Sequence, residues 1–100
     1  MNTPLVYVLR CDGFFKIGFT RTSIQDRVRI FQSGNPHNIE IYSSYMTPMA
    51  YHLEKYLHSK YLSKLKRGEW FSLCNEDLEN MPIFVANFNN LMSIETKETK

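Results

Sequence analysis

Residues 5–19 read LVYVLRCDGFFKIGF, and this stretch decides the fold. Residues 5–10 are rich in Val, Leu and Tyr, a composition that favours a β-strand. Asp12-Gly13 follows, and this dipeptide between apolar runs is the strongest short signal for a hairpin turn. Residues 14–19 then supply the returning strand. The stretch therefore predicts an antiparallel hairpin.

A two-residue turn fixes the register of this hairpin. It places Leu9 opposite Lys16 and Tyr7 opposite Gly18. Because side chains alternate across a strand, Tyr7 and Lys16 share one face and are diagonal neighbours, about 7–8 Å apart at their backbones. Their polar ends can then converge on one phosphate, and Gly18 leaves room beside the tyrosine ring for a ligand or a backbone. The alternative is a tyrosine that packs in the strand and a lysine that is merely exposed.

The remaining predicted elements are three helices, a third strand and a short extended piece. Each helix begins at a capping residue, and the first two end at helix breakers. In chain order they are a helix from the Ser23 cap to Gly34, a strand over residues 39–45, a helix from the Thr47 cap to about Lys64, an extended piece over residues 69–73, and a helix from the Asn75 cap that restarts or kinks at Pro82.

The composition is that of a folded chain. With 100 residues, 43% hydrophobic and 14% aromatic, it can fill a core, whereas a disordered chain would have fewer aromatic residues. No apolar run reaches the roughly 20 residues of a membrane span, and the N-terminus lacks the regions of a signal peptide. We therefore expect a cytoplasmic protein without a membrane partner. Cys11 and Cys74 have no metal-binding spacing and are expected to be free thiols.

The net charge of +2 conceals an uneven distribution. Residues 1–67 carry ten Lys or Arg and four acidic residues, whereas residues 68–100 carry two lysines and six acidic residues. The first segment can therefore meet a polyanion such as DNA, and the second would be repelled by it. Ordinary solvated surface charge is the alternative.

The second predicted helix carries a carboxylate in its apolar stripe. At about 100° per residue, Glu54 falls inside that stripe. A carboxylate rarely faces a core without a cation, hydrogen-bond donors or a metal ion. His58, one turn further on, can reach it. A purely structural pair with Arg27 or a lysine is the alternative. The stripe consists of Ala50, Leu53, Leu57 and Tyr61.

Arginines on and near the first predicted helix are candidate contacts to phosphate. Arg27 lies on the flank of the apolar face, where its guanidinium can reach the sheet edge and hold a phosphate. A side chain that only lies along the apolar surface is the alternative. Arg10, Arg21 and Arg29 are candidate contacts to the DNA backbone.

The sequence Glu69-Trp70-Phe71 has a structural character. Trp70, the single tryptophan, and Phe71 are large apolar anchors. Glu69 can pair with Lys66 or Arg67, and a direct role at the site is the less favoured alternative.

Four of these segments together resemble the motifs of the GIY-YIG endonuclease superfamily. The matching residues are Val6-Tyr7, Lys16-Ile17-Gly18, Arg27 and Glu54, within a region of similarity over residues 5–73. Leu5, Lys16 and Phe31 stand where the family has glycine, tyrosine and histidine, and Asn75 is a candidate for its late asparagine. The small phage and meiotically up-regulated gene 113 branch is similar in Gln32-x-Gly34-Asn35-Pro36, Glu54-x-x-x-His58 and Gly68-Glu69-Trp70-Phe71.

The resemblance implies an α+β fold, in which a three-stranded antiparallel sheet is flanked by helices in one nuclease domain at residues 1–94, followed by a polar tail at 95–100. It also implies a DNA endonuclease that uses one divalent ion, Mg²⁺ or Mn²⁺. The implied roles are metal binding for Glu54, assistance to the attacking water for Tyr7 and stabilisation of phosphate charge for Arg27. Lys16 either does the same as Arg27 or lowers the pKa of Tyr7. His58, by helix spacing, is the candidate for the missing imidazole.

Two other function classes stay open. The first is a DNA-binding module that keeps the fold and the basic face without cleavage. The second is a protein-interaction domain that uses an apolar patch on the last helix. Because the chain shows no separate DNA-binding domain, a homodimer or a protein partner would supply specificity. The residues proposed for the apolar patch are Phe84, Phe88, Leu91 and Met92.

Overall fold

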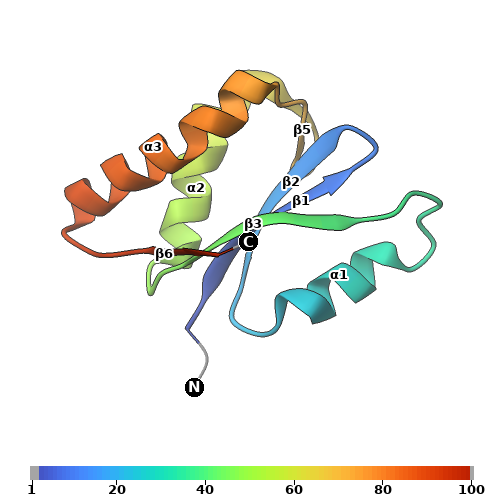
Figure 1. Ribbon diagram of the computed structural model, residues 1–100, viewed down its shortest axis with the longest axis horizontal. Helices are drawn as coiled ribbons and strands as arrows, with labels where there is room; N and C mark the ends of the chain where they lie inside the picture. Colours follow the sequence, from blue (N-terminus) through green and yellow to red (C-terminus); the bar gives the residue numbers. More distant parts are fainter. Residues whose placement is uncertain (1–2, 100) are drawn as a thin grey trace.

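The computed structural model describes residues 3–99, which form an α+β fold with one six-stranded antiparallel sheet and three α-helices (Figure 1). The strand order in the sheet is β4-β5-β2-β1-β3-β6. The elements are β1 (Leu5–Cys11), β2 (Phe14–Thr20), α1 (Ile24–Gln32), β3 (Glu40–Met46), α2 (Ala50–Lys60), the 3₁₀ helix η1 (Leu62–Lys64), β4 (Leu65–Arg67), β5 (Trp70–Phe71), α3 (Asn75–Met92) and β6 (Lys97–Thr99).

The hairpin of β1 and β2 has the predicted register. Tyr7 lies opposite Gly18 and Leu9 opposite Lys16. Asp12 and Gly13 have φ angles of 51° and 81°, the left-handed conformation that a two-residue hairpin turn requires at both positions. The dipeptide therefore sets the turn, and the turn sets which side chains share a face.

The expected three-stranded sheet is an undercount. β1, β2 and β3 form its centre, but β5 pairs with β2, β4 pairs with β5, and β6 pairs with β3. The added strands have two or three residues each, too few to show the alternation that marks a strand in a sequence. β6 also lies within the predicted polar tail, where no apolar residue points to a strand.

Helices cover both faces of the sheet. Figure 1 shows α1 on one face and α2 with α3 on the other. Under α1 lies a cluster that includes Tyr7, Leu9 and Ile24, whereas Val8, Ile17 and Leu53 belong to the larger cluster under α2 and α3. Within residues 3–99, none of the helices combines the length and apolar character needed to cross a bilayer.

Only the first of the three predicted helix caps is confirmed. The Ser23 hydroxyl accepts the Asp26 backbone N–H at 3.3 Å. Thr47 does not cap α2, because its hydroxyl accepts the N–H of Met49, which itself becomes the capping residue. The helix therefore begins at Ala50 instead of Pro48. The helix also ends at Lys60 instead of Lys64.

The last helix begins one residue before its predicted cap. Cys74 is the capping residue, and the Asp77 carboxylate accepts the Cys74 backbone N–H at 2.9 Å. Asn75 is therefore already helical. Pro82 lies inside α3, which continues to Met92, so the expected restart at Pro82 is wrong.

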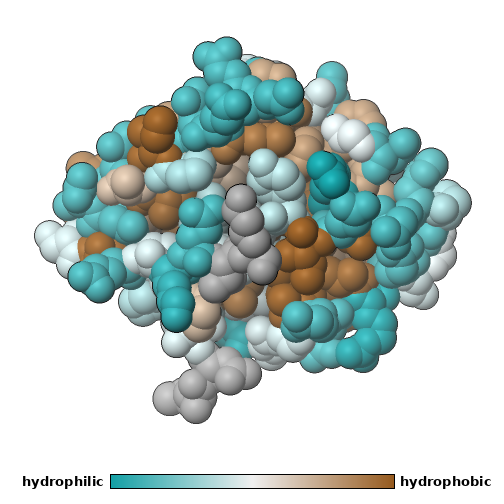
Figure 2. Space-filling view, viewed as in Figure 1, coloured by the Kyte–Doolittle hydropathy of each residue, from teal (hydrophilic) through white to brown (hydrophobic). Residues whose placement is uncertain are grey.

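Two of the four residues expected to form an exposed apolar patch on α3 pack against the core instead. Phe88 is buried, and the ring of Phe84 packs on that of Tyr61 with centroids 5.7 Å apart. Leu91 and Met92 are exposed. Figure 2 shows the outer surface of α3 as mostly hydrophilic, with isolated apolar side chains. The two phenylalanines therefore belong to the core contact between α2 and α3.

Candidate active site

The outer edge of β2 is only partly covered by another strand. β5 pairs with Phe15 and Lys16 and goes no further. Among the described residues, no strand lies beside the rest of β2 on that side. The two faces of the sheet can therefore meet around this edge, and side chains from α1, α2 and the β4–β5 turn converge there.

The backbone of Ile17 positions two side chains at this edge. Its N–H donates to the carbonyl of Glu69 at 3.2 Å, and its carbonyl accepts a hydrogen bond from Nε2 of His58 at 2.7 Å. The first bond holds the β4–β5 turn against β2, and the second holds α2. In the neutral imidazole, a proton on Nε2 leaves the lone pair of Nδ1 available.

Glu54, His58 and Glu69 form a cluster that could hold a metal ion. One ligand atom from each lies within 4.8 Å of the others. Glu54 is only 2% exposed. Two carboxylates and an imidazole suit a divalent cation such as Mn²⁺ or Mg²⁺. The bond from His58 to a backbone carbonyl is the outer-shell contact that orients most metal-binding histidines.

The surroundings of Glu54 disfavour the ionised form of its carboxylate. Burial raises its pKa, and the negative charge of Glu69 raises it further. His58 and Lys55 act in the opposite direction, with the Lys55 Nζ 3.7 Å from Glu54 Oε1. Lys55 itself is largely exposed. A divalent cation in the cluster would remove the repulsion between the two acids and compensate the lost solvation.

Tyr7 and Arg27 lie together beside this cluster. Tyr7 is buried, and a Cβ on Gly18 would come within 2.4 Å of its hydroxyl oxygen. Burial raises the pKa of Tyr7, a hydrogen bond from Arg27 opposes the rise, and the charges of Glu69 and Glu54 reinforce it. The hydroxyl is therefore within electrostatic reach of both acids.

Arg27 retains a buried donor without a partner. Its Nε has no hydrogen-bond partner among the described residues. Its guanidinium carbon lies 5.1 Å from the centroid of the Phe31 ring. A buried donor left unpaired is unfavourable, so it is a position at which an anion would be bound.

Lys16 lies at the same edge but pairs with an acid. Its Nζ is 3.3 Å from Glu69 Oε1, 4.6 Å from the Phe31 ring centroid and 5.5 Å from that of Trp70. The ammonium of Lys16 and the guanidinium of Arg27 therefore both lie over the Phe31 ring, whose π electrons attract each cation.

The remaining candidate residues lie outside this cluster. Arg10 pairs with Glu40 at 2.8 Å, and Arg29 pairs with Asp26 one helical turn before it. Arg21 lies over the Phe19 ring, 5.5 Å from its centroid. All three arginines are exposed.

The two aromatic anchors differ in burial. Phe71 is buried and contacts the His58 ring, with centroids 5.0 Å apart. Trp70 is half-buried at the margin of the cluster under α1.

Glu69 is the residue that sequence reasoning missed. Its carboxylate pairs with Lys16, so the expected pair with Lys66 or Arg67 is wrong. The register of β5 against β2 brings Glu69 beside Lys16. A two-residue strand carries no periodic signal, and only an acid directly before the Trp-Phe pair hinted at a role.

Comparison with known proteins corrects the family suggested by the short motifs. A family model for the T5orf172 domain matches residues 5–86. This is a different family from the GIY-YIG endonucleases, so the resemblance built on four separate motifs is wrong. Neither a curated protein nor a solved structure matches the chain significantly. The match covers most of the chain, from β1 into α3, and the chain belongs to the T5orf172 domain family.

Proposed function

We propose that this protein hydrolyses phosphodiester bonds of DNA with the help of one divalent metal ion. The observation that carries the proposal is the convergence of Glu54, His58 and Glu69 on one point beside Tyr7 and Arg27. The acidic cluster offers a cation site, and the unpaired guanidinium nitrogen offers an anion site. A divalent cation at the first site and a phosphate oxygen at the second would satisfy both.

The three ligand residues would hold Mn²⁺ or Mg²⁺. A bound ion supplies Lewis-acid polarisation of the phosphate and stabilises the leaving oxygen. Arg27 binds a non-bridging phosphate oxygen through its fork of donors. Lys16, already at the same edge, adds a second positive charge. These cations stabilise the charge that develops on the phosphate.

Tyr7 is assigned an orienting role. Burial raises the pKa of its hydroxyl, so the group stays protonated in the metal-free protein. A protonated hydroxyl that accepts a hydrogen bond from Arg27 can also donate one, and a water molecule is a suitable acceptor. The role as a general base requires a lowered pKa, which the surroundings of Tyr7 do not favour.

The choice of DNA as substrate rests on the charge of the chain around the site. Residues 1–67, which include all elements from β1 to β4, carry ten Lys or Arg against four acids. Among the described residues, Arg21 has no ion-pair partner and remains a candidate phosphate contact. A basic segment that also carries Glu54 and His58 favours a polyanionic substrate.

A plasmid assay tests the proposal. Supercoiled DNA is incubated with wild type, Glu54→Ala, Tyr7→Phe and Glu79→Ala in Mn²⁺, Mg²⁺ or EDTA. Glu79 is an exposed acid on α3 and serves as the matched control against contaminating nucleases. We expect nicked or linear product with wild type and Glu79→Ala in metal only, about 100-fold or greater loss with Glu54→Ala, and an intermediate loss with Tyr7→Phe. Equal cleavage by Glu54→Ala would remove Glu54 from the mechanism.

The ion pairs at the site favour one alternative. Lys16 pairs with Glu69 at 3.3 Å and Lys55 lies 3.7 Å from Glu54, so both acids have a cationic neighbour without a metal ion. A DNA-binding module that has no hydrolytic activity would keep these pairs. The assay separates the two functions, because such a module would retain DNA in a salt-sensitive manner and give no product in any metal.

A further inference from the structure

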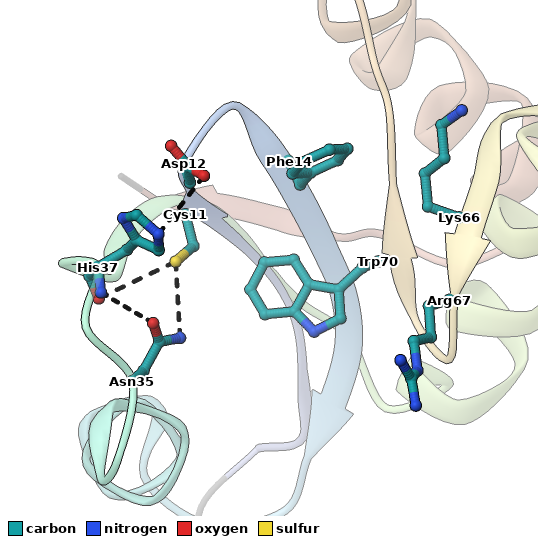
Figure 3. Close-up of a pocket in the computed structure, with 8 residues that line it drawn as sticks. All are labelled: Cys11, Asp12, Phe14, Asn35, His37, Lys66, Arg67 and Trp70. Atoms are coloured by element: carbon teal, nitrogen blue, oxygen red, sulfur yellow. Dashed lines mark hydrogen bonds and ion pairs between the residues drawn. The ribbon is translucent and has the colours of Figure 1, made fainter.

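A cavity that none of the acidic-cluster residues lines has Trp70 in its wall. It has a volume of about 330 Å³ and is lined by the β1–β2 hairpin, the loop after α1, and strands β4 and β5. Figure 3 shows the Trp70 indole between the hairpin and β4, with Phe14 beside it. Ligand pockets span roughly 300–1,000 Å³, so this cavity suits a single small planar group.

Two aromatic side chains give this cavity stacking surfaces. Phe14 is 40% exposed and Trp70 is half-buried. Within residues 3–98, neither ring stacks on another aromatic side chain. An exposed phenylalanine at a hairpin tip contributes little to the core. Its position instead offers a face to a planar ligand.

The charges around the cavity favour an anionic ligand. Lys66 and Arg67 on β4 are exposed, and neither has a carboxylate partner among the described residues. The one carboxylate in the lining, that of Asp12, faces Nε2 of His37 at 3.6 Å. An aromatic slot beside two unpaired cations matches a base with its phosphate.

The polar groups of the cavity are already engaged. The Asn35 side chain donates to the sulfur of Cys11 at 3.6 Å and accepts the backbone N–H of His37 at 2.9 Å. Few groups are left to read the edge of a base. Recognition would then come from stacking, which tolerates every base.

The cavity adjoins the proposed hydrolytic site. Lys16 lies opposite Trp70 in the β2–β5 ladder, and its Nζ is 5.5 Å from the indole centroid and 3.3 Å from Glu69 Oε1. Glu69 directly precedes Trp70. A nucleotide whose phosphate lies at Lys16 and Arg27 can therefore place a neighbouring base in the cavity.

We propose that this cavity binds an unpaired base of the DNA strand, flanking the phosphate held at the metal cluster. The substrate class is accordingly DNA with a single-stranded or unpaired nucleotide, because a base within a duplex cannot enter an aromatic slot without leaving its stack. This inference rests on the proposed function for the identity of the ligand. Its binding step requires no metal ion.

Trp70 is the only tryptophan, so its fluorescence reports on the cavity directly. The protein is titrated in EDTA with a short mixed-sequence single strand and with the blunt duplex of the same sequence. We expect saturable quenching by the single strand and an affinity about 10-fold or more above that for the duplex, since stacking contributes roughly 1–3 kcal/mol per base. Phe14→Ala should weaken single-strand binding about 5- to 100-fold. Ile83→Ala, which truncates an exposed apolar residue on α3, should leave the affinity unchanged.

The outcomes distinguish this inference from the proposed function. Equal affinity for both DNA forms, or unchanged single-strand affinity in Phe14→Ala, overturns the base-binding cavity even if metal-dependent cleavage is observed. Quenching by the single strand alone, with an affinity that Phe14→Ala weakens, supports the base-binding cavity. This support holds even if no cleavage occurs in Mn²⁺ and the proposed hydrolysis is abandoned.

Discussion

At the scale of single residues, Glu54 best shows how a candidate metal ligand can oppose stability. It is placed among apolar side chains by the periodicity of α2 and is almost fully buried. Both burial and Glu69 raise its pKa. An acid with a raised folded-state pKa stabilises the fold in its protonated form, and this contribution is lost as pH rises through that pKa.

Glu54→Gln is therefore expected to raise the melting temperature in EDTA at neutral pH. A gain of about 1 kcal/mol corresponds to roughly 4–8 °C for a domain of this size. The difference from wild type should shrink as the pH falls, because the wild-type acid then becomes neutral. Adding Mn²⁺ should raise the melting temperature of wild type and leave that of the variant unchanged. A lower melting temperature for Glu54→Gln in EDTA would mean that Lys55 satisfies the carboxylate in the metal-free protein.

His58 should determine which metal ion the cluster prefers. Imidazole favours Mn²⁺ over Mg²⁺, whereas carboxylates accept both ions. In His58→Gln we expect Mn²⁺ affinity to fall about 10- to 100-fold and Mg²⁺ affinity to fall less, as measured by calorimetric titration. His52→Gln changes a histidine outside the cluster and serves as the control. Parallel losses for both ions would indicate that His58 acts only through its bond to Ile17.

Gly18 is required by the tyrosine opposite it. A methyl group at this position would lie 2.4 Å from the Tyr7 hydroxyl oxygen and 2.6 Å from the ring carbon that carries it. In Gly18→Ala the end of the tyrosine must move, so its bond with Arg27 is expected to break. Cleavage should fall about as far as in Tyr7→Phe, and the combination of both substitutions should cost little more than either one. Additive losses in this double-mutant cycle would contradict a shared cause.

At the scale of elements, Asp77 joins α2, η1 and α3. Its carboxylate accepts bonds from Cys74 at the start of α3 and from Lys64 of η1 at 2.8 Å, and its backbone carbonyl accepts the Tyr61 hydroxyl. The bond from Lys64 is the main reason that the pKa of Asp77 is lowered. An acid with a lowered folded-state pKa stabilises the fold above its unfolded pKa of about 3.9 and loses that contribution as the pH falls through the folded value.

We therefore expect acid to weaken wild type more than Asp77→Asn. Urea midpoints measured between pH 7 and pH 3 should show the variant less stable at pH 7 and the two proteins converging toward pH 3. Because Lys64 is well exposed, the difference at pH 7 should be small and should decrease in high salt. A constant difference across the range would mean that ionisation of Asp77 does not contribute to the stability of the fold.

The elements that sequence predicted correctly are those set by local chemistry. Asp12-Gly13 fixed the turn and hence the pairing of Tyr7 with Gly18. The Ser23 cap likewise depends on residues three positions apart. In contrast, β4, β5 and β6 exist because distant segments supply their partners, and two or three residues carry no pattern of their own.

At the scale of the whole molecule, the candidate site could be predicted in part. Strand alternation identified Tyr7 and Lys16, and helix periodicity identified Glu54 and His58. Glu69 could not be found in this way, because the short turn between β4 and β5 brings it to the cluster. Short motifs also failed to identify the family, because they use only a few positions. The family model matches residues 5–86 as one continuous region.

The brevity of β5 has a consequence for how this protein behaves in solution. An uncovered strand edge invites another chain to add to the sheet, and natural proteins guard such edges with charge. Here the ion pair between Lys16 and Glu69 stands at that edge, where such a guard is needed. Variants that neutralise both should self-associate through β2, so residues proposed here for chemistry would also protect the protein against aggregation.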